Sequence, residues 1–190
     1  MEKTEKLTPL ESLALIEDVI RRTHENIRQY SSCFLLWGWL MALASVSRFV
    51  LETKTDFPYY FIPFPICTGA GLIITIVYFT KKRSPYAETH LSTFLGYLWM
   101  GLAAGFIATV FVSVSQKMEP FVYTLILAGI GTAVTGLTLR FKPLVIGSFV
   151  FLLSSVLCLY VPSEYKVLIN GLAVVCGYLI PGYLLKGKHN

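Results

Sequence analysis

Residues that could carry out chemistry are scarce in the apolar parts of this sequence. The four cysteines lie far apart, with no CxxC pair and no histidine at metal-ligand spacing. No HExxH, GxSxG or Walker-type glycine loop occurs. The serines of the apolar stretches have no histidine and carboxylate nearby that could activate them as nucleophiles. We therefore expect no metal, no other cofactor and no enzymatic activity.

Two polar residues within the apolar stretches are candidate contact sites. Arg48 lies near the end of its stretch, so its side chain can extend to the membrane interface and pair with Glu52 one turn later. Contact with a lipid phosphate or an anionic solute is the functional alternative. Asn170 lies in the first turn of the last stretch, where an interhelical hydrogen bond or a ligand contact would satisfy its amide.

Small residues form the most regular pattern in the apolar stretches. A row at i,i+4 spacing consists of Thr124, Ala128, Thr132 and Gly136. A GxxxG pair, Gly101 and Gly105, lies in the preceding stretch. Such residues let helices approach closely in lipid. They predict helix packing, inside one bundle or at an oligomer face, and the alternative is a solute path.

The composition places the chain in the membrane class. It is 55% apolar and 14% charged, and its mean hydropathy is +0.64. Soluble domains carry about 25% charged residues. These values exclude a disordered chain, a nucleic-acid-binding domain and an ordinary soluble enzyme. The composition therefore predicts the lipid bilayer as the main partner of this chain.

Six apolar stretches, each near the length of about 20 residues that a spanning helix needs, follow one another with short connections. They cover about 33–51, 60–80, 93–115, 120–139, 143–161 and 167–185. We predict an all-α polytopic membrane protein with six transmembrane helices in three hairpins. The bundle occupies residues 32–186 and a tail occupies 187–190. Pro63 and Pro65 fall inside the second stretch and predict a bend there.

Residues 1–31 differ from the rest of the chain. Thr8 and Pro9 mark a helix start. Apolar residues then recur at helical spacing, with charged residues on the opposite face. The apolar stripe includes Leu13, Ile16, Ile20 and Ile27. We predict a separate cytoplasmic amphipathic helix, which is packed under the bundle, laid on the membrane surface or docked to a partner. The interpretation we favour is that it docks a cytoplasmic or membrane protein partner, or a second copy, through this stripe.

The basic residues predict the orientation of the spans. Of the 16 Lys and Arg residues, 12 lie in the segments on the same side as the charged start and 4 lie on the other side. Connections rich in Lys and Arg stay in the cytoplasm. Both termini are therefore expected to be cytoplasmic.

An internal repeat accompanies the hairpins. Residues 34–40 (FLLWGWL) are similar to residues 94–100 (FLGYLWM), an alignment that pairs Trp37 with Tyr97 and Trp39 with Trp99. The alternative is that any six-span protein with short loops has this rhythm.

The charged amphipathic start followed by residues 35–40 (LLWGWL) resembles a group of small bacterial integral membrane proteins that have no assigned activity. The similarity covers the N-terminal helix and the first span. It implies the bacterial inner membrane as the location, and it implies no activity.

Three hypotheses for the function follow. The first is a non-enzymatic interaction or regulatory protein that docks a partner through the N-terminal helix. The second is a small transporter or channel, for a neutral or lipid-like solute because no Asp or Glu lies inside the spans. The third, a membrane enzyme acting on lipid, would depend on Tyr86, Glu88 and His90 in an inner loop, for which a solvated loop is the simpler interpretation.

Overall fold

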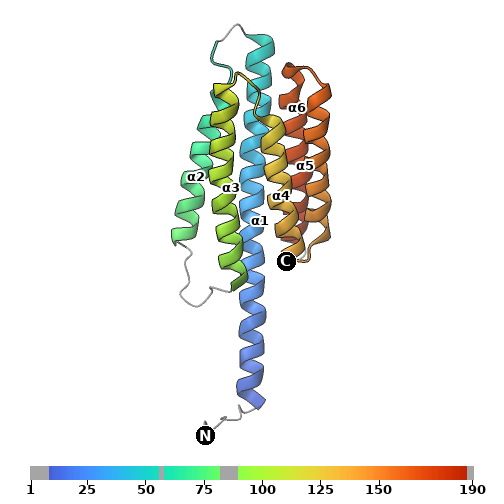
Figure 1. Cartoon of the computed structure of the whole chain (residues 1–190). Coiled ribbons are helices and arrows are strands. Elements are labelled where there is room, and N and C mark those ends of the chain that lie inside the picture. Colours follow the sequence, from blue (N-terminus) through green and yellow to red (C-terminus); the bar gives the residue numbers. More distant parts are fainter. Residues whose placement is uncertain (1–8, 56–57, 82–89, 188–190) are drawn as a thin grey trace.

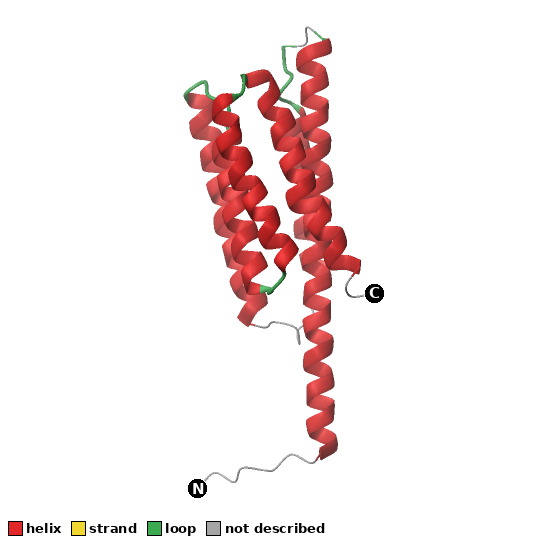
Figure 2. Cartoon of the chain, turned by 90° about the vertical axis from the view of Figure 1, so that its right-hand side faces the viewer, coloured by secondary structure: helices red, strands yellow, loops and turns green. Residues whose placement is uncertain are grey.

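The computed structural model describes residues 9–55, 58–81 and 90–187, with side chains from Tyr30 onward apart from those of Phe79 and His90. All regular structure in these ranges is helical, as predicted (Figures 1 and 2). The elements are α1 (Pro9–Lys54), α2 (Pro63–Lys81), α3 (His90–Ser115), α4 (Phe121–Thr138), α5 (Lys142–Tyr160), α6 (Ser163–Val174), the π-helical turn η1 (Val175–Leu179) and α7 (Ile180–Gly187). The last three follow without a break and are called the last helix.

Within the described ranges, five helical stretches are long and apolar enough to cross a membrane. They are Tyr30–Lys54, Leu91–Ser115, Phe121–Thr138, Lys142–Tyr160 and Ser163–Gly187. The apolar stretch of α2, Pro63–Tyr78, is shorter. The helices are consistent with a multi-pass membrane protein.

The N-terminal amphipathic segment and the first span form one helix. α1 contains 46 residues, about 69 Å at 1.5 Å per residue. The break expected between residues 31 and 33 is not present, because neither Gly nor Pro occurs between Leu10 and Trp37 to terminate the helix. The N-terminal part of α1, blue in Figure 1, projects beyond the ends of the other helices.

α2 begins at Pro63, so the predicted bend inside the second span is wrong. The amides of the first helical turn have no intrahelical acceptor, and a proline there loses no hydrogen bond. Pro63 and Pro65 both lie in this turn. The turn before it is closed by hydrogen bonds from Phe64 N to Phe61 O at 3.2 Å and from Ile66 N to Ile62 O at 3.3 Å.

The last helix widens into a π-helical turn just before Pro181. Proline has no amide hydrogen, so Pro181 cannot donate to the carbonyl of Gly177 as the α-helical pattern requires. The helix widens at this place instead. Gly147 of α5 packs on this place: a Cβ added to Gly147 would lie 2.9 Å from Gly177 O and 3.0 Å from Gly177 Cα. The widened turn therefore lies in direct backbone contact with α5.

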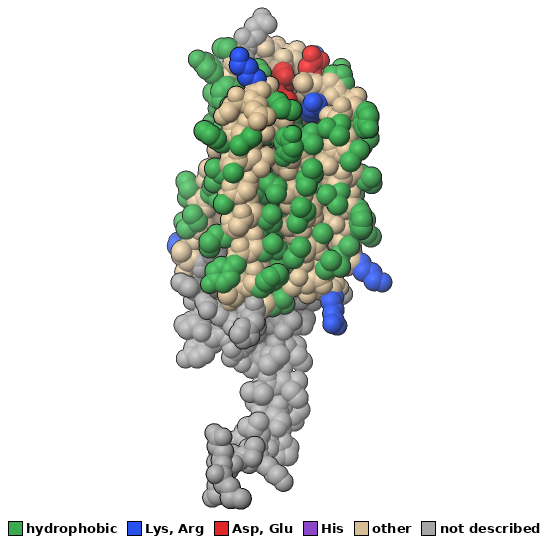
Figure 3. All heavy atoms as spheres, in the orientation of Figure 1, with side chains coloured by type: hydrophobic (Ala, Val, Ile, Leu, Met, Phe, Trp, Pro, Cys, Tyr) green, Lys and Arg blue, Asp and Glu red, His purple; other side chains and the backbone are tan. Residues whose placement is uncertain are grey.

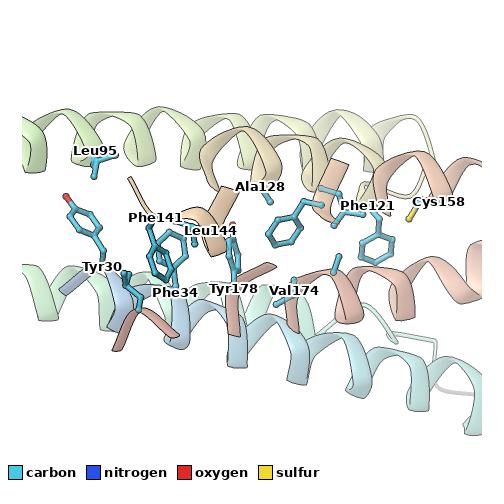
Figure 4. Packing of buried hydrophobic residues seen from close by; sticks show 14 of the residues in the cluster. Tyr30, Phe34, Leu95, Phe121, Ala128, Phe141, Leu144, Cys158, Val174 and Tyr178 are labelled. Atoms are coloured by element: carbon cyan, nitrogen blue, oxygen red, sulfur yellow. The ribbon is translucent and has the colours of Figure 1, made fainter. Parts of the chain in front are cut away.

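The helices pair in a definite order. α1 packs on α2 and on the last helix, α3 packs on α4, and α5 packs on α4 and on the last helix. The core contains aromatic rings from α1, α5 and the last helix (Figure 4). The ring centroid of Tyr178 lies 5.5 Å from that of Phe34 and 4.8 Å from that of Phe151. These rings join the first and third hairpins at mid-bundle.

Charged side chains gather at the two ends of the bundle, and hydrophobic side chains cover the face between them (Figure 3). The end toward which α1 projects carries Lys81, Arg140, Lys142 and Lys186. The opposite end carries both signs: Arg48, Lys54, Lys117, Lys166, Glu52, Glu119 and Glu164. An apolar belt between charged ends is the surface expected of a protein in a bilayer.

Candidate functional site

Arg48 of α1 is buried, with 5% of its surface exposed. Its Nη2 donates to Oε1 of Glu119 at 2.7 Å, and its Nε donates to Oε2 of Glu52 at 3.4 Å. Glu119 lies in the turn between α3 and α4, so the ion pair links α1 to the second hairpin. Sequence reasoning found Glu52 because i,i+4 pairs are local. It missed Glu119, although this is the carboxylate in the connection between the third and fourth spans.

Two aromatic rings lie against the same guanidinium. The Cζ of Arg48 is 5.0 Å from the ring centroid of Phe121 and 5.3 Å from that of Tyr60. A cation over an aromatic face is attracted by the ring quadrupole. Arg48 therefore connects α1 with α4 and with the turn before α2. A lipid phosphate that bound Arg48 would have to compete with the carboxylates of Glu119 and Glu52.

Asn170 lies at the contact between α1 and α6, and it is buried. Its Nδ2 donates to Ser45 Oγ at 3.1 Å, and Ser45 Oγ donates to Met41 O at 2.9 Å. The next residue, Gly171, lets the helices approach, because a Cβ there would lie 3.1 Å from Ser45 Cβ. The amide of Asn170 thus makes an interhelical hydrogen bond.

The row of small residues on α4 lies partly in the contact with α5. A Cβ added to Gly136 would lie 2.9 Å from the backbone N of Val145. Thr132, which is buried, donates to Ala128 O at 2.6 Å, and the hydroxyl of Thr124 donates to Phe121 O at 3.2 Å. Both hydroxyls donate to carbonyls of their own helix, so neither offers a free hydrogen-bond donor to a solute path.

The GxxxG pair on α3 lies elsewhere. A Cβ on Gly105 would have its nearest described neighbour, Leu127 Cδ1, at 3.7 Å, and a Cβ on Gly101 would meet no described atom within 4 Å. The structure therefore does not bring these two glycines and the α4 row into one site.

Sequence reasoning missed two equivalent contacts of tryptophan, one in each of the first two hairpins. Trp37 Nε1 donates to Thr75 Oγ1 at 3.2 Å, and Trp99 Nε1 donates to Thr135 Oγ1 at 3.1 Å. The repeat is therefore aligned with Trp37 opposite Trp99, and the alignment proposed from residues 34–40 is shifted by two positions. The sequence did contain a signal for this alignment: a glycine is followed four residues later by a threonine on both returning helices, at Gly71 and Thr75 and at Gly131 and Thr135.

Trp39, which the sequence alignment had paired with Trp99, lies at a different place. It is 50% exposed and donates from Nε1 to the hydroxyl of Tyr183 at 3.1 Å, between α1 and α7. This contact lies on the surface of the bundle and not inside a hairpin.

The predicted docking residues lie on the part of α1 that projects beyond the bundle: Leu13, Ile16, Ile20 and Ile27. Their side chains lie outside the described part of the structure. Tyr86 and Glu88 also lie outside it, and of His90 only the backbone, the first residue of α3, is described.

The described residues contain no group of three or more His, Cys, Asp or Glu that could hold a metal ion. Comparisons with protein-family models, curated proteins and solved structures gave no match.

Proposed function

We propose that this chain is a non-enzymatic interaction or regulatory protein of the bacterial inner membrane. It docks a protein partner through the projecting N-terminal part of α1, which we call the arm (residues 9–29). The observation that carries the proposal is the continuity of α1 from Pro9 to Lys54. Because the helix does not break at the membrane, binding at the arm is mechanically connected to the first span.

The base of the arm is held by two other helices. The hydroxyl of Tyr30 donates to Ser92 O on α3 at 3.2 Å, and the hydroxyl of Ser31 donates to Gly182 O on α7 at 2.9 Å. These bonds come from neighbouring residues and point to different helices. They support a fixed arm direction, which presents the stripe with Ile20 to a partner at low entropic cost.

The proposed topology has six spans with both termini in the cytoplasm. α2 contains 19 residues, about 28 Å at 1.5 Å per residue, against a hydrocarbon core of about 30 Å. With α2 crossing, the helices alternate in direction. The arm then lies at the end that carries Lys81, Arg140, Lys142 and Lys186. Retention of basic ends in the cytoplasm supports this orientation.

Transport has less support. The interior between α1, α5 and the last helix is filled by the rings of Phe34, Phe151 and Tyr178. Arg48, the charged residue buried among the described spans, already has carboxylate partners. A solute path would have to displace this packing.

The experiment compares two glutamate substitutions in the full chain, Ile20→Glu on the apolar stripe and Gln29→Glu on the opposite face. Each variant is cross-linked in native membranes, extracted in mild detergent and isolated. We expect wild type and Gln29→Glu to bring down the same partner, and Ile20→Glu to lose it while running as the same monodisperse particle. Equal recovery with both variants, or no partner with wild type, would overturn the proposal.

A further inference from the structure

The three hairpins share one internal contact, in which an aromatic ring on the first helix packs on a glycine of the second. A Cβ on Gly71 would lie 3.2 Å from Cη2 of Trp37, and a Cβ on Gly131 would lie 3.2 Å from Cη2 of Trp99. In the third hairpin the ring of Phe151 packs directly on Gly177. The hairpins α1–α2, α3–α4 and α5–last helix therefore repeat one contact between a ring and a glycine.

These units are arranged so that the second helix of one packs on the first helix of the next. α4 packs on α5, and the last helix packs on α1. Each pair is called a seam here. The remaining seam, α2 with α3, is not among the packed helix pairs of the described residues. Two of the three seams are thus closed and one is open.

Glycines of the second helix make the closed seams tight. In the α4–α5 seam, a Cβ on Gly129 would lie 2.9 Å from Leu152 Cδ2 and 3.3 Å from Ser148 O. In the seam between the last helix and α1, a Cβ on Gly182 would lie 3.0 Å from Leu35 Cδ2. Each glycine therefore forms a notch that a leucine of the next hairpin fills.

The open seam has the same features without neighbours. Gly69 lies two residues before Gly71, as Gly129 lies two residues before Gly131, yet a Cβ on Gly69 would meet no described atom within 4 Å. On α3, Met100 directly follows Trp99 as Leu152 directly follows Phe151, and Met100 is 68% exposed. The open seam therefore has a notch at Gly69 on α2 and a side chain suited to such a notch, Met100, on α3, but the two are not in contact.

Gly96 on α3 and Ile73 on α2 also belong to the open seam. Gly96 takes the place of Ser148, three residues before the ring, and a Cβ on it would meet no described atom within 4 Å. On α2, Ile73 is 65% exposed. Both helices lie on the same side of the bundle (Figure 1).

The α3 of the same chain is fixed in place by contacts of α1 with the second hairpin. They occur at three levels: Tyr30 hydroxyl to Ser92 O at 3.2 Å, the ring of Phe34 on that of Trp99 at 5.9 Å, and Arg48 to Glu119 at 2.7 Å. Closing α2 onto its own α3 would break contacts along the whole length of the bundle. A helix that packs on this face of α2 would therefore have to come from another chain.

We propose that a second copy of this chain closes the seam, with α2 of each copy packed on α3 of the other. A two-fold axis along the membrane normal keeps both copies in one orientation and makes the interface self-complementary. It also makes α2 antiparallel to α3 of the second copy, as α4 is to α5. Small residues permit such close packing in lipid, where no hydrophobic force drives association.

The register of the α4–α5 seam gives the expected pairs. Leu152 fills the notch at Gly129 in the closed seam, so Met100 of the second copy should fill the notch at Gly69. In the same register Ile73 should lie against Gly96 of the second copy. This dimer goes beyond the proposed docking function and does not depend on it.

The first test uses two differently tagged copies in one membrane, both carrying Cys67→Ala. One copy carries Gly69→Cys and the other Met100→Cys, and the matched control pairs Gly69→Cys with Leu153→Cys, an exposed position of α5. After mild oxidation, we expect a disulfide-linked product with both tags for the first pair and at least tenfold less for the control. Equal yields, or no product, would overturn the proposal.

The second test fills the notches. Full-length copies labelled with a donor or an acceptor fluorophore are reconstituted in phospholipid vesicles, and dimer formation is measured by energy transfer. We expect Gly69→Leu and Gly96→Leu to lower the dimer fraction about tenfold, while Gly101→Leu leaves it unchanged. Gly101 is the matched control because a Cβ there also meets no described atom within 4 Å, yet it lies off the proposed stripe. Unchanged transfer in the first two variants would contradict the dimer.

Discussion

Arg48 Nη2 lies 2.7 Å from Glu119 Oε1, a carboxylate 71 positions further along the chain. The pair is mostly shielded, since the side chains of Arg48 and Glu119 are 6% and 23% exposed. It fixes the end of α1 to the turn from which α4 begins. Because Glu52 and two aromatic rings contact the same guanidinium, the cluster acts as the clamp at this end of the bundle.

Removing the longer-range carboxylate should weaken the clamp. We expect Glu119→Gln to lower the free energy of unfolding by about 1–3 kcal/mol, because a buried charged donor loses its strongest acceptor. Glu164→Gln, an exposed carboxylate at the same end, is the control and should change stability by less than about 0.5 kcal/mol. Denaturant unfolding in detergent, followed by circular dichroism, measures both variants; equal stability would refute the clamp.

The indole hydrogen bonds of the hairpins can be tested without removing the rings. Trp99→Phe keeps an aromatic ring near Gly131 but removes the N–H that bonds to Thr135. Hydrogen bonds between transmembrane helices are worth about 0.6 kcal/mol on average, so we expect a loss of that order. Trp37→Phe in the first hairpin should cost the same within error. A large difference between the two would mean that the hairpins are not equivalent.

Backbone contact at the π-helical turn predicts a strong effect of a very small change. Gly147→Ala would place a methyl group 2.9 Å from Gly177 O, where the backbone cannot move aside, and overpacking of this kind costs about 1–3 kcal/mol. Gly101→Ala has open space and should be neutral or slightly stabilising, since alanine favours helix. Thermal unfolding in detergent compares the two; a fall in Tm for Gly101→Ala alone would reverse our assignment.

The polar contact between α1 and α6 is suited to a double-mutant cycle. Asn170 and Ser45 are joined by a hydrogen bond of 3.1 Å. We expect Asn170→Ala and Ser45→Ala each to destabilise the protein, and the double variant to lose about 0.5–1 kcal/mol less than the sum of the two. Additive losses would show that the two side chains do not interact in the membrane.

Several features of the molecule could be predicted from local sequence. The lengths and ends of the spans follow from the apolar stretches and from the prolines and charges between them, so α3, α4 and α5 begin and end within three residues of the expected limits. The Arg48–Glu52 pair follows from spacing along one helix. The sequence likewise predicted that the regular structure would be all-helical.

Other features depend on the tertiary structure. In a soluble helix the polar face marks the outside, but here core-facing Leu125 and lipid-facing Leu153 are equally apolar. Hydropathy therefore does not tell which helices pack together. The Glu119 partner, the tryptophan register, the outward position of Gly101 and the open α2–α3 seam were set by the arrangement of the hairpins. The sequence by itself determined which segments are apolar helices, and the packing decided which of their faces meet, because lipid and protein interior attract the same side chains.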